Sequence, residues 1–327
     1  MTTFGPSVLE LDLEAEATRI ASTLRAQVGD LKRRGLVLGL SGGIDSGLCI
    51  ALAVRALGSE RVVALLMPDR DTPDDATQRA AAYGRRLGVE VILEDIDASL
   101  EALGCFRRRD EAVRRVFPDL PDGYRAKVAL AGEVMDTDRV PYFNLVVDDG
   151  AGGQQTRRMP PDAYLQVVSA TNMKQRVRKL VEYTHAETRN YAVLGTPNHL
   201  EYALGFFVRG GDGLADVKPI AHLYKTQVFA LAAHLGVDGS IRSAVPSTDT
   251  YSLPQTQEEF YFGISLGQVD LMLYAQEHDI PREAIAEGMG LSLDQVDRVL
   301  RDMTGKRRAA ARGSGEALLI QPAQADG

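Results

Sequence analysis

The sequence has little of what several protein classes require. It contains two cysteines, Cys49 and Cys105, and no C-x-x-C pair, so neither a disulfide framework nor a zinc site is indicated. The five histidines show no H-x-x-x-H spacing, which argues against a histidine metal site. Basic residues do not exceed acidic ones, and the formal net charge is −8. A protein whose main role is to coat nucleic acid needs a basic surface, so that role is not expected.

Secretion and membrane signals are also missing. The N-terminal stretch MTTFGPSVLELDLEAEA is acidic and lacks a positively charged start followed by an apolar core. The longest apolar runs are interrupted by glycine or charge well short of a membrane span. The 45% of apolar residues is ordinary for a globular protein. We therefore predict a soluble, cytoplasmic protein with no membrane partner.

What is present is an alternation of helices and short, continuously apolar strands. A helical pattern over 13–34 precedes the strand LVLGL, and further strands follow as RVVALLMPD, VEVILEDI and YAVLGT, separated by amphipathic helices. This order predicts an α/β fold with a doubly wound, mostly parallel sheet and helices on both faces. Such sheets bind ligands at the carboxyl ends of their strands.

The alternation is interrupted over 104–165, which we interpret as an insertion. CFRRRDEAVRRVF predicts a basic helix, and FNLVVDDGAGGQQTRRM predicts a hairpin around a glycine-rich turn. The insertion is either a surface elaboration or subunit contact, or a segment that covers a site or recognises its substrate. The C-terminal part reads as helical. We expect one domain over 1–310 and a flexible tail over 311–327.

The stretch LVLGLSGGIDSGL carries the chemistry. A glycine-containing turn between a buried strand and a helix directs backbone N–H groups into a concavity at the positive end of the helix dipole, which is an anion site. A Walker loop would supply a lysine, but here Asp45 stands in the turn. A carboxylate beside phosphate is reasonable if Mg²⁺ bridges the two. The other interpretation is a Gly-Gly turn with an ordinary capping residue, which is common in α/β proteins.

The string SGGIDS after an apolar strand resembles the signature of ATP pyrophosphatases, which cleave ATP between its α and β phosphates. The succession GTPNHLEYALGFFVRGGDGLADVKPIAHLYKTQV over 195–228 is similar to that of NAD synthetases, and NMKQRVRK and VPSTD match further segments of that family. The resemblance covers about 13–104 and 166–260. It implies an adenine nucleotide alpha hydrolase-like fold.

The resemblance also implies roles for individual residues. The turn would hold ATP phosphates, Asp45 and Glu201 would be Mg²⁺ ligands, and Asp45, Lys225 and Asp212 would be the catalytic set. The full implied ATP contacts are Ser41, Gly42, Gly43, Asp45, Ser46, Thr196, Lys225 and Ser247. The implied dinucleotide contacts are Arg176, Arg178, Asp212 and Asp216, although the two arginines are two apart on a helix and point in different directions.

The implied reaction is a C–N ligation in two steps. The carboxylate of nicotinic acid adenine dinucleotide attacks ATP to give an acyl adenylate and pyrophosphate, and ammonia then displaces AMP to give NAD. About 35 residues precede the first strand, so we expect no amidase domain there. Free ammonia, or a glutaminase on a separate chain, would supply nitrogen. The family usually forms homodimers, and a homodimer is expected here.

Three alternatives stay open at this point. The first is an amide ligase of the same fold that acts on another carboxylate, for which the insertion and the 250–262 segment speak. The second is a tRNA-modifying relative, which would be expected to show a basic face or paired cysteines. The third is a nucleotide-binding module without catalysis. Two mild departures from the family pattern are Lys179, where methionine is frequent, and R-G-G-D-G in place of K-Y-G-D-G.

Overall fold

The computed structural model describes residues 4–131, 142–150, 153–246 and 250–314. A parallel four-stranded sheet with the order β3-β2-β1-β7 lies at its centre. The strands are short and apolar, as predicted: β1 Leu36–Gly39, β2 Val62–Leu66, β3 Glu90–Leu93 and β7 Ala192–Val193. The prediction of a mostly parallel α/β sheet is confirmed.

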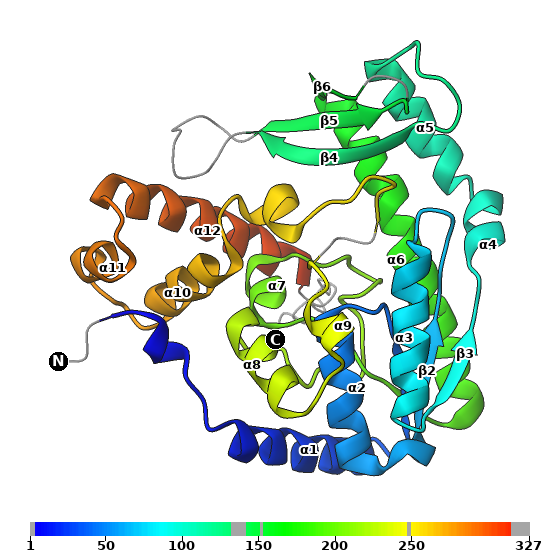
Figure 1. The fold of residues 1–327 in the computed structure, drawn as a ribbon, viewed down its shortest axis with the longest axis vertical. Helices are drawn as coiled ribbons and strands as arrows, with labels where there is room; N and C mark the ends of the chain where they lie inside the picture. The colour runs from blue at the N-terminus through cyan, green and yellow to red at the C-terminus, as the bar shows by residue number, and fades with distance from the viewer. Residues whose placement is uncertain (1–3, 132–141, 151–152, 247–249, 315–327) are drawn as a thin grey trace, which may run out of the picture.

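Both faces of this sheet are covered by helices, because its strands alternate apolar side chains between two cores. Leu36 and Leu38 belong to a core formed with α1, α2, α3 and α8, whereas Val37 belongs to one formed with α4, α5 and α6. In Figure 1, α3 and α6 run beside strands β2 and β3 of the central sheet. The helices are α1 Leu13–Asp30, α2 Ile44–Leu57, α3 Asp74–Arg86, α4 Asp97–Ala102, α5 Cys105–Val116, α6 Pro161–Arg189 and α8 Lys225–His234.

The insertion contains a second, antiparallel sheet of three strands in the order β4-β5-β6. Its strands are β4 Arg125–Ala131, β5 Tyr142–Asp148 and β6 Gln154–Arg158. The predicted basic helix is α5, and the predicted hairpin is β5–β6, where Asp148 pairs with Gln154. Strand β4 was not predicted. The sheet lies over α5 and one end of α6 at one extremity of the molecule (Figure 1).

The C-terminal part is helical, as predicted, and packs as a unit with its own apolar core on α7 and the N-terminal segment. The helix α12 continues to Ser314, so the expected tail starts helical, and 315–327 lie outside the described residues. Within the described ranges, no helix has the length and apolar character that a membrane crossing requires. The remaining elements are α7 His199–Leu204, α9 Gly239–Arg242, α10 Leu266–Glu277, α11 Arg282–Met289, α12 Leu293–Ser314, η1 Pro6–Leu9, η2 Ser59–Arg61 and η3 Glu258–Phe262.

Candidate active site

The turn between β1 and α2 is built by its glycines and serines. Gly42 has φ +84°, and a Cβ there would lie 2.6 Å from the carbonyl oxygen of Ala76, so only glycine fits. The Ser41 hydroxyl accepts the Gly43 N–H at 3.2 Å, and the Ser46 hydroxyl donates to the Gly43 carbonyl at 3.0 Å. Among the described residues, no side chain caps the N-terminus of α2. The first-turn N–H groups of this helix therefore remain available for an anion.

Asp45, on the first turn of α2, is the centre of a buried polar cluster. Its carboxylate accepts the Asn198 side-chain amide at 3.0 Å and forms an ion pair with the Lys225 ammonium, which is 1% exposed. Lys225 reaches it from the first position of α8. Sequence reasoning placed Lys225 on a phosphate, whereas in this structure its partner is Asp45.

Glu201 lies beside Asp45, at the start of α7. Asn198 and Glu201 form a capping box, in which the Glu201 carboxylate accepts the Asn198 N–H at 3.1 Å. The same carboxylate accepts the Gln257 side-chain amide at 3.0 Å. Burial and the Asp45 charge raise the pKa of Glu201 to about 8, against the opposing effect of Lys225. Burial lowers the pKa of Lys225, but the two carboxylates outweigh it and the net shift is upward.

Asp45, Glu201 and Gln257 border a cavity of about 400 Å³ at the carboxyl end of the central sheet, whereas Asn198 and Lys225 lie behind them and do not line it. Its wall includes the whole β1–α2 turn and, of the other predicted site residues, Thr196, Glu201, Arg178 and Asp212. The opposite part is aromatic. It is formed by Tyr164, Phe206, Phe207, Tyr251, Phe260 and Tyr261. A volume of this size and a mixed polar and aromatic lining suit a small-molecule substrate.

The two predicted arginines diverge, as expected from their spacing. Arg178 lines the cavity and donates to the Met67 carbonyl at 3.2 Å and to Asp69 at 3.1 Å. Arg176 is exposed and donates to the Arg209 carbonyl at 3.1 Å. The structure therefore brings only Arg178 into the cavity wall.

The two predicted aspartates of the 205–217 loop also separate. Asp212 lines the cavity and accepts the Val208 N–H at 2.6 Å, and burial raises its pKa. Asp216 accepts the Val193 N–H at 2.8 Å and so ties the loop to the end of β7. It is exposed and does not line the cavity. The predicted Ser247 lies outside the described residues.

A smaller cavity of about 100 Å³ adjoins Ser41 and shares Arg178 and Asp212 with the larger one. It is also lined by Lys179 and Glu182, which form a buried ion pair at 2.5 Å. Lys179 is the position at which the sequence departs from the family pattern. Its charge is matched within the protein, which explains how a lysine is tolerated in this interior.

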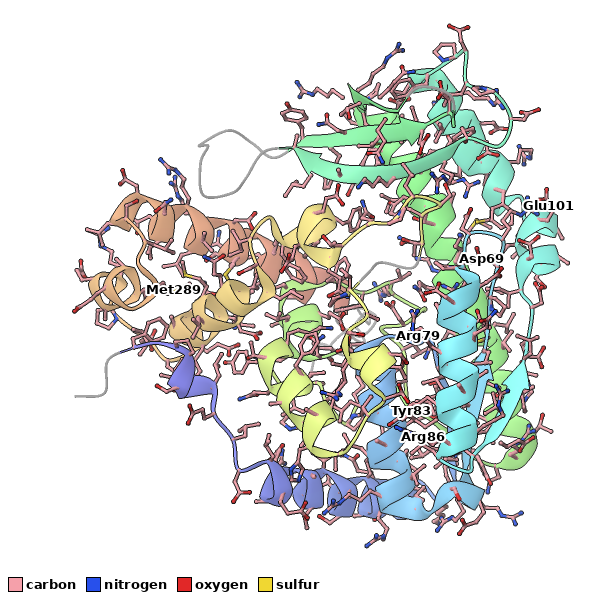
Figure 2. The ribbon with its side chains drawn as sticks, in the orientation of Figure 1. Asp69, Arg79, Tyr83, Arg86, Glu101 and Met289 are labelled. Carbon is pink, nitrogen blue, oxygen red and sulfur yellow. The ribbon has the colours of Figure 1, made fainter. Side chains whose placement is uncertain are left out.

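Sequence reasoning missed several residues of the site. Asn198 is fully buried and bonds both Asp45 and Glu201, and the N-x-x-E pattern of a capping box in NHLE could have identified it. Gln257 carried no such signal. Arg79 lines the cavity from the middle of α3 (Figure 2), and its Nε is buried without a hydrogen-bond partner among the described atoms. An unpaired buried donor at a cavity wall suits a polar or anionic ligand.

The residues of the cavity could hold a divalent cation if the substrate supplied some of its ligands. Within the described ranges, no group of three or more His, Cys, Asp and Glu side chains could hold a metal by itself. Asp45 and Glu201 are two half-buried carboxyl groups side by side, and a cation between them would favour the ionised form of Glu201. Mg²⁺ bound through one or two carboxylates together with substrate phosphates matches this donor set.

Comparison with known proteins agrees with this geometry. The sequence model of the NAD synthase family matches residues 16–115 and 152–309. The chain belongs to the NAD synthase family. An NH3-dependent NAD+ synthetase of Rhizobium meliloti is 48% identical over 98% of this chain and 96% of its own length. One of Thermotoga maritima is 32% identical over 86% of this chain and 92% of its own length.

Solved structures of NAD synthases and a related enzyme share the fold. The NMN synthetase of Francisella tularensis matches with a TM-score of 0.66 and 21% identity, over 95% of this chain and 99% of that one. The NH3-dependent NAD synthetase of Campylobacter jejuni matches with a TM-score of 0.63 and 20% identity, over 95% of this chain and all of that one. At these identities the match concerns the fold alone.

Proposed function

We propose that this NAD synthase family member converts nicotinic acid adenine dinucleotide to NAD with ATP and ammonia, through an acyl adenylate, and releases AMP and pyrophosphate. One observation carries the proposal. In a chain 48% identical to an NH3-dependent NAD+ synthetase over nearly its full length, the β1–α2 turn and the Asp45–Glu201 pair border one cavity. An anion site beside two carboxyl groups is the arrangement expected to bind ATP together with Mg²⁺.

The β1–α2 turn is proposed to bind the phosphates of ATP. The free N–H groups of the first turn of α2 attract the anion, and the Ser41 hydroxyl, which is part of the turn, is proposed to donate to it. The Ser46 hydroxyl donates to the Gly43 carbonyl in this structure, so it would have to rotate away from that carbonyl to donate to a phosphate. Thr196, at the end of β7, borders the same space. Ser247 stays a predicted contact. Arg79 adds a donor that sequence reasoning did not supply.

Asp45 and Glu201 are proposed to hold Mg²⁺ with the help of the ATP phosphates. The cation would neutralise the charge that develops on the departing pyrophosphate. Lys225 is proposed to have two roles. Its ammonium group neutralises the charge of the Asp45 carboxylate, and it provides a positive charge near the phosphates of ATP. Asn198 and Gln257 orient the two carboxylates through hydrogen bonds to their oxygens.

The aromatic part of the cavity, together with Arg178 and Asp212, is proposed to receive the dinucleotide. Planar rings stack favourably on aromatic side chains, and Tyr164 and Phe260 are among the aromatic residues that line the cavity. Arg176 and Asp216 act here as residues that fix the 205–217 loop. No nucleophilic side chain is required, because the chain's task is to align two anions and exclude water from the adenylate.

Free ammonia is the proposed nitrogen donor, with a glutaminase on another chain as the other source. The relatives from Rhizobium meliloti and Mesorhizobium japonicum are named NH3-dependent NAD+ synthetases, which supports ammonia as the donor. The homodimer and the cytoplasmic location stay predictions, and light scattering of the purified protein would test the former.

A product assay tests the reaction. The purified protein is supplied with ATP, Mg²⁺, nicotinic acid adenine dinucleotide and either ammonium or glutamine, and NAD and AMP are followed together. We expect equal amounts of both, with ammonium only. The corresponding mononucleotide acid is the control, because an NMN synthetase has this fold. AMP formation with that acid and not with the dinucleotide would move the chain to the rival amide ligase.

A further inference from the structure

Two of the three strands of the insertion's antiparallel sheet lie outside the residues that the family model matches. The family model matches residues 16–115 and 152–309 and leaves 116–151 unmatched. Strands β4 and β5 lie wholly within that unmatched range. Their role is therefore not given by family membership, and it has to be read from their contacts.

Strand β4 is an edge of its sheet, and its outer side is occupied by the 251–259 segment. Edge strands present unpaired N–H and C=O groups, and here Ala126 donates to the Ser252 hydroxyl at 2.9 Å and accepts the Leu253 N–H at 3.2 Å. The Gln255 side chain donates to the Val128 carbonyl. Lys127 and Glu259 add an ion pair at 2.6 Å, with Lys127 13% exposed.

The same segment continues directly into the active site. Two residues beyond Gln255, the side chain of Gln257 is 7% exposed and donates to Glu201 at 3.0 Å. Tyr251 and Phe260 line the cavity. From β5, Phe143 stacks on Tyr164 of the cavity wall with ring centroids 4.2 Å apart. None of the described residues of the three strands lines the cavity, and the sheet acts on the cavity through the lining residues that it contacts.

We propose that the antiparallel sheet of the insertion positions residues of the active site. Strand β4 holds the 251–259 segment in place, and Gln257 on that segment orients the Glu201 carboxylate so that it can bind a divalent cation. The metal part rests on the proposed function. Gln257 is a positioning residue, because it acts through Glu201. The geometry supports the assignment, since a buried carboxylate with a partner on each oxygen has a defined orientation, and metal ligands depend on such partners.

Charge reversals on β4 test the proposal. Lys127→Glu turns the ion pair with Glu259 into repulsion at the contact between strand and segment. Arg125→Glu is the matched control, because Arg125 pairs with Asp148 at 2.8 Å inside the same sheet. The pair Lys127→Glu with Glu259→Lys restores opposite charges in swapped order. Lys127→Met is the milder variant should the reversal impair folding.

Two measurements on the full chain decide the matter. Amide hydrogen exchange of 250–262 should accelerate in the Lys127 variants and not in Arg125→Glu. The affinity for Mn²⁺ in the presence of ATP should fall roughly tenfold in Lys127→Glu and in Gln257→Ala, the size found for partners of metal ligands. Because both changes act on the same contact chain, the double variant should lose no more than either single one. The charge swap should restore both readouts.

Equal exchange and equal Mn²⁺ affinity in Lys127→Glu and Arg125→Glu would overturn the positioning role, and so would additive losses in Lys127→Glu and Gln257→Ala. These outcomes are separate from the proposed reaction. If the wild-type chain makes NAD and Lys127→Glu matches Arg125→Glu in hydrogen exchange and Mn²⁺ affinity, the proposed reaction stands and the positioning role of the sheet is rejected. If the wild-type chain makes no NAD, the proposed reaction is rejected, and hydrogen exchange of 250–262 still tests whether the sheet positions that segment.

Discussion

At the scale of single residues, the site depends on where a side chain is absent as much as on where one is present. Gly42 and Gly123 have nearly the same φ, +84° and +83°, but their surroundings differ. A Cβ on Gly42 would meet the Ala76 carbonyl oxygen at 2.6 Å, whereas a Cβ on Gly123 would meet nothing within 4 Å. Comparing alanine substitutions at the two positions therefore distinguishes the cost of backbone strain, which both share, from the cost of a steric clash, which occurs at Gly42 only.

We expect Gly123→Ala to lower the free energy of unfolding by about 1 kcal/mol, through strain at positive φ. Gly42→Ala should cost about 2 kcal/mol more, because the clash is with backbone that cannot rotate away. It should also weaken ATP binding, since the turn must shift. Urea denaturation and ATP titration measure the two effects. Equal stability losses in both variants would show that α3 gives way and that the close approach at Ala76 is unimportant.

The residues that sequence reasoning could and could not supply differ in kind. Asp45 and the turn residues come from one contiguous string, so they were predictable, and Glu201 followed from the resemblance. Gln257 was not, because its role exists only after a distant segment folds onto α7. Arg176 and Asp216 show the converse: they fit the family pattern, yet they bond the backbone of Arg209 and Val193 and stay out of the cavity wall.

At the scale of elements, helix N-termini organise the site. Three helices, α2, α7 and α8, begin near the cavity and contribute Asp45, Glu201 and Lys225 from their first turns. Helices α2 and α8 were predicted because each follows a strand or turn signal as a mostly apolar run of ten or more residues, whereas α7, with six residues, is too short for such a signal. Strand β4 was missed although a Pro-Asp-Gly turn signal precedes RAKVALA, because three of its seven residues are alanine, which has a low strand propensity.

The capping box of α7 gives an element-scale prediction. Asn198→Ala removes the cap of α7 and also the amide that donates to Asp45. Ser265→Ala is the matched control, because it removes the cap of α10 at an exposed position. Each should cost about 1 kcal/mol of unfolding free energy. Only Asn198→Ala should lower NAD formation, by roughly tenfold, because a partner of a proposed metal ligand is lost.

Thermal denaturation and the product assay distinguish the two variants. If Ser265→Ala slowed NAD formation as much as Asn198→Ala, the loss would reflect stability in general, and the bond from Asn198 to Asp45 would have no special part in the reaction.

At the scale of the whole molecule, the carboxyl edge of one sheet collects residues far apart in the sequence. Asp45 and Lys225 are 180 positions apart, and Asn198 reaches Asp45 across 153. The alternation of strands and helices predicted that edge, because parallel strands end together. It could not predict which side chains converge there in three dimensions. That depends on the cores that set each helix on the sheet.

A ligand that bridges these distant segments should stabilise the fold as a whole. At 100 times its dissociation constant, a ligand that binds only the folded state adds about 2.7 kcal/mol, which corresponds to roughly 4 °C in the melting temperature of a chain of this size. We expect MgATP to produce this shift. A chelator should remove most of it, because without the cation the phosphates lie beside the Asp45 carboxylate with nothing to bridge the two.

Asp45→Asn should lose the part of the shift that depends on Mg²⁺, since it removes one of the two proposed ligands. Asp74→Asn is the matched control: Asp74 also lies in the first turn of a helix, α3, but it is exposed. Differential scanning fluorimetry with and without chelator compares them. If ATP raised the melting temperature equally in the presence of chelator, or if Asp45→Asn behaved as Asp74→Asn does, the cation would not sit between Asp45 and the phosphates. The anion site at α2 would then act alone.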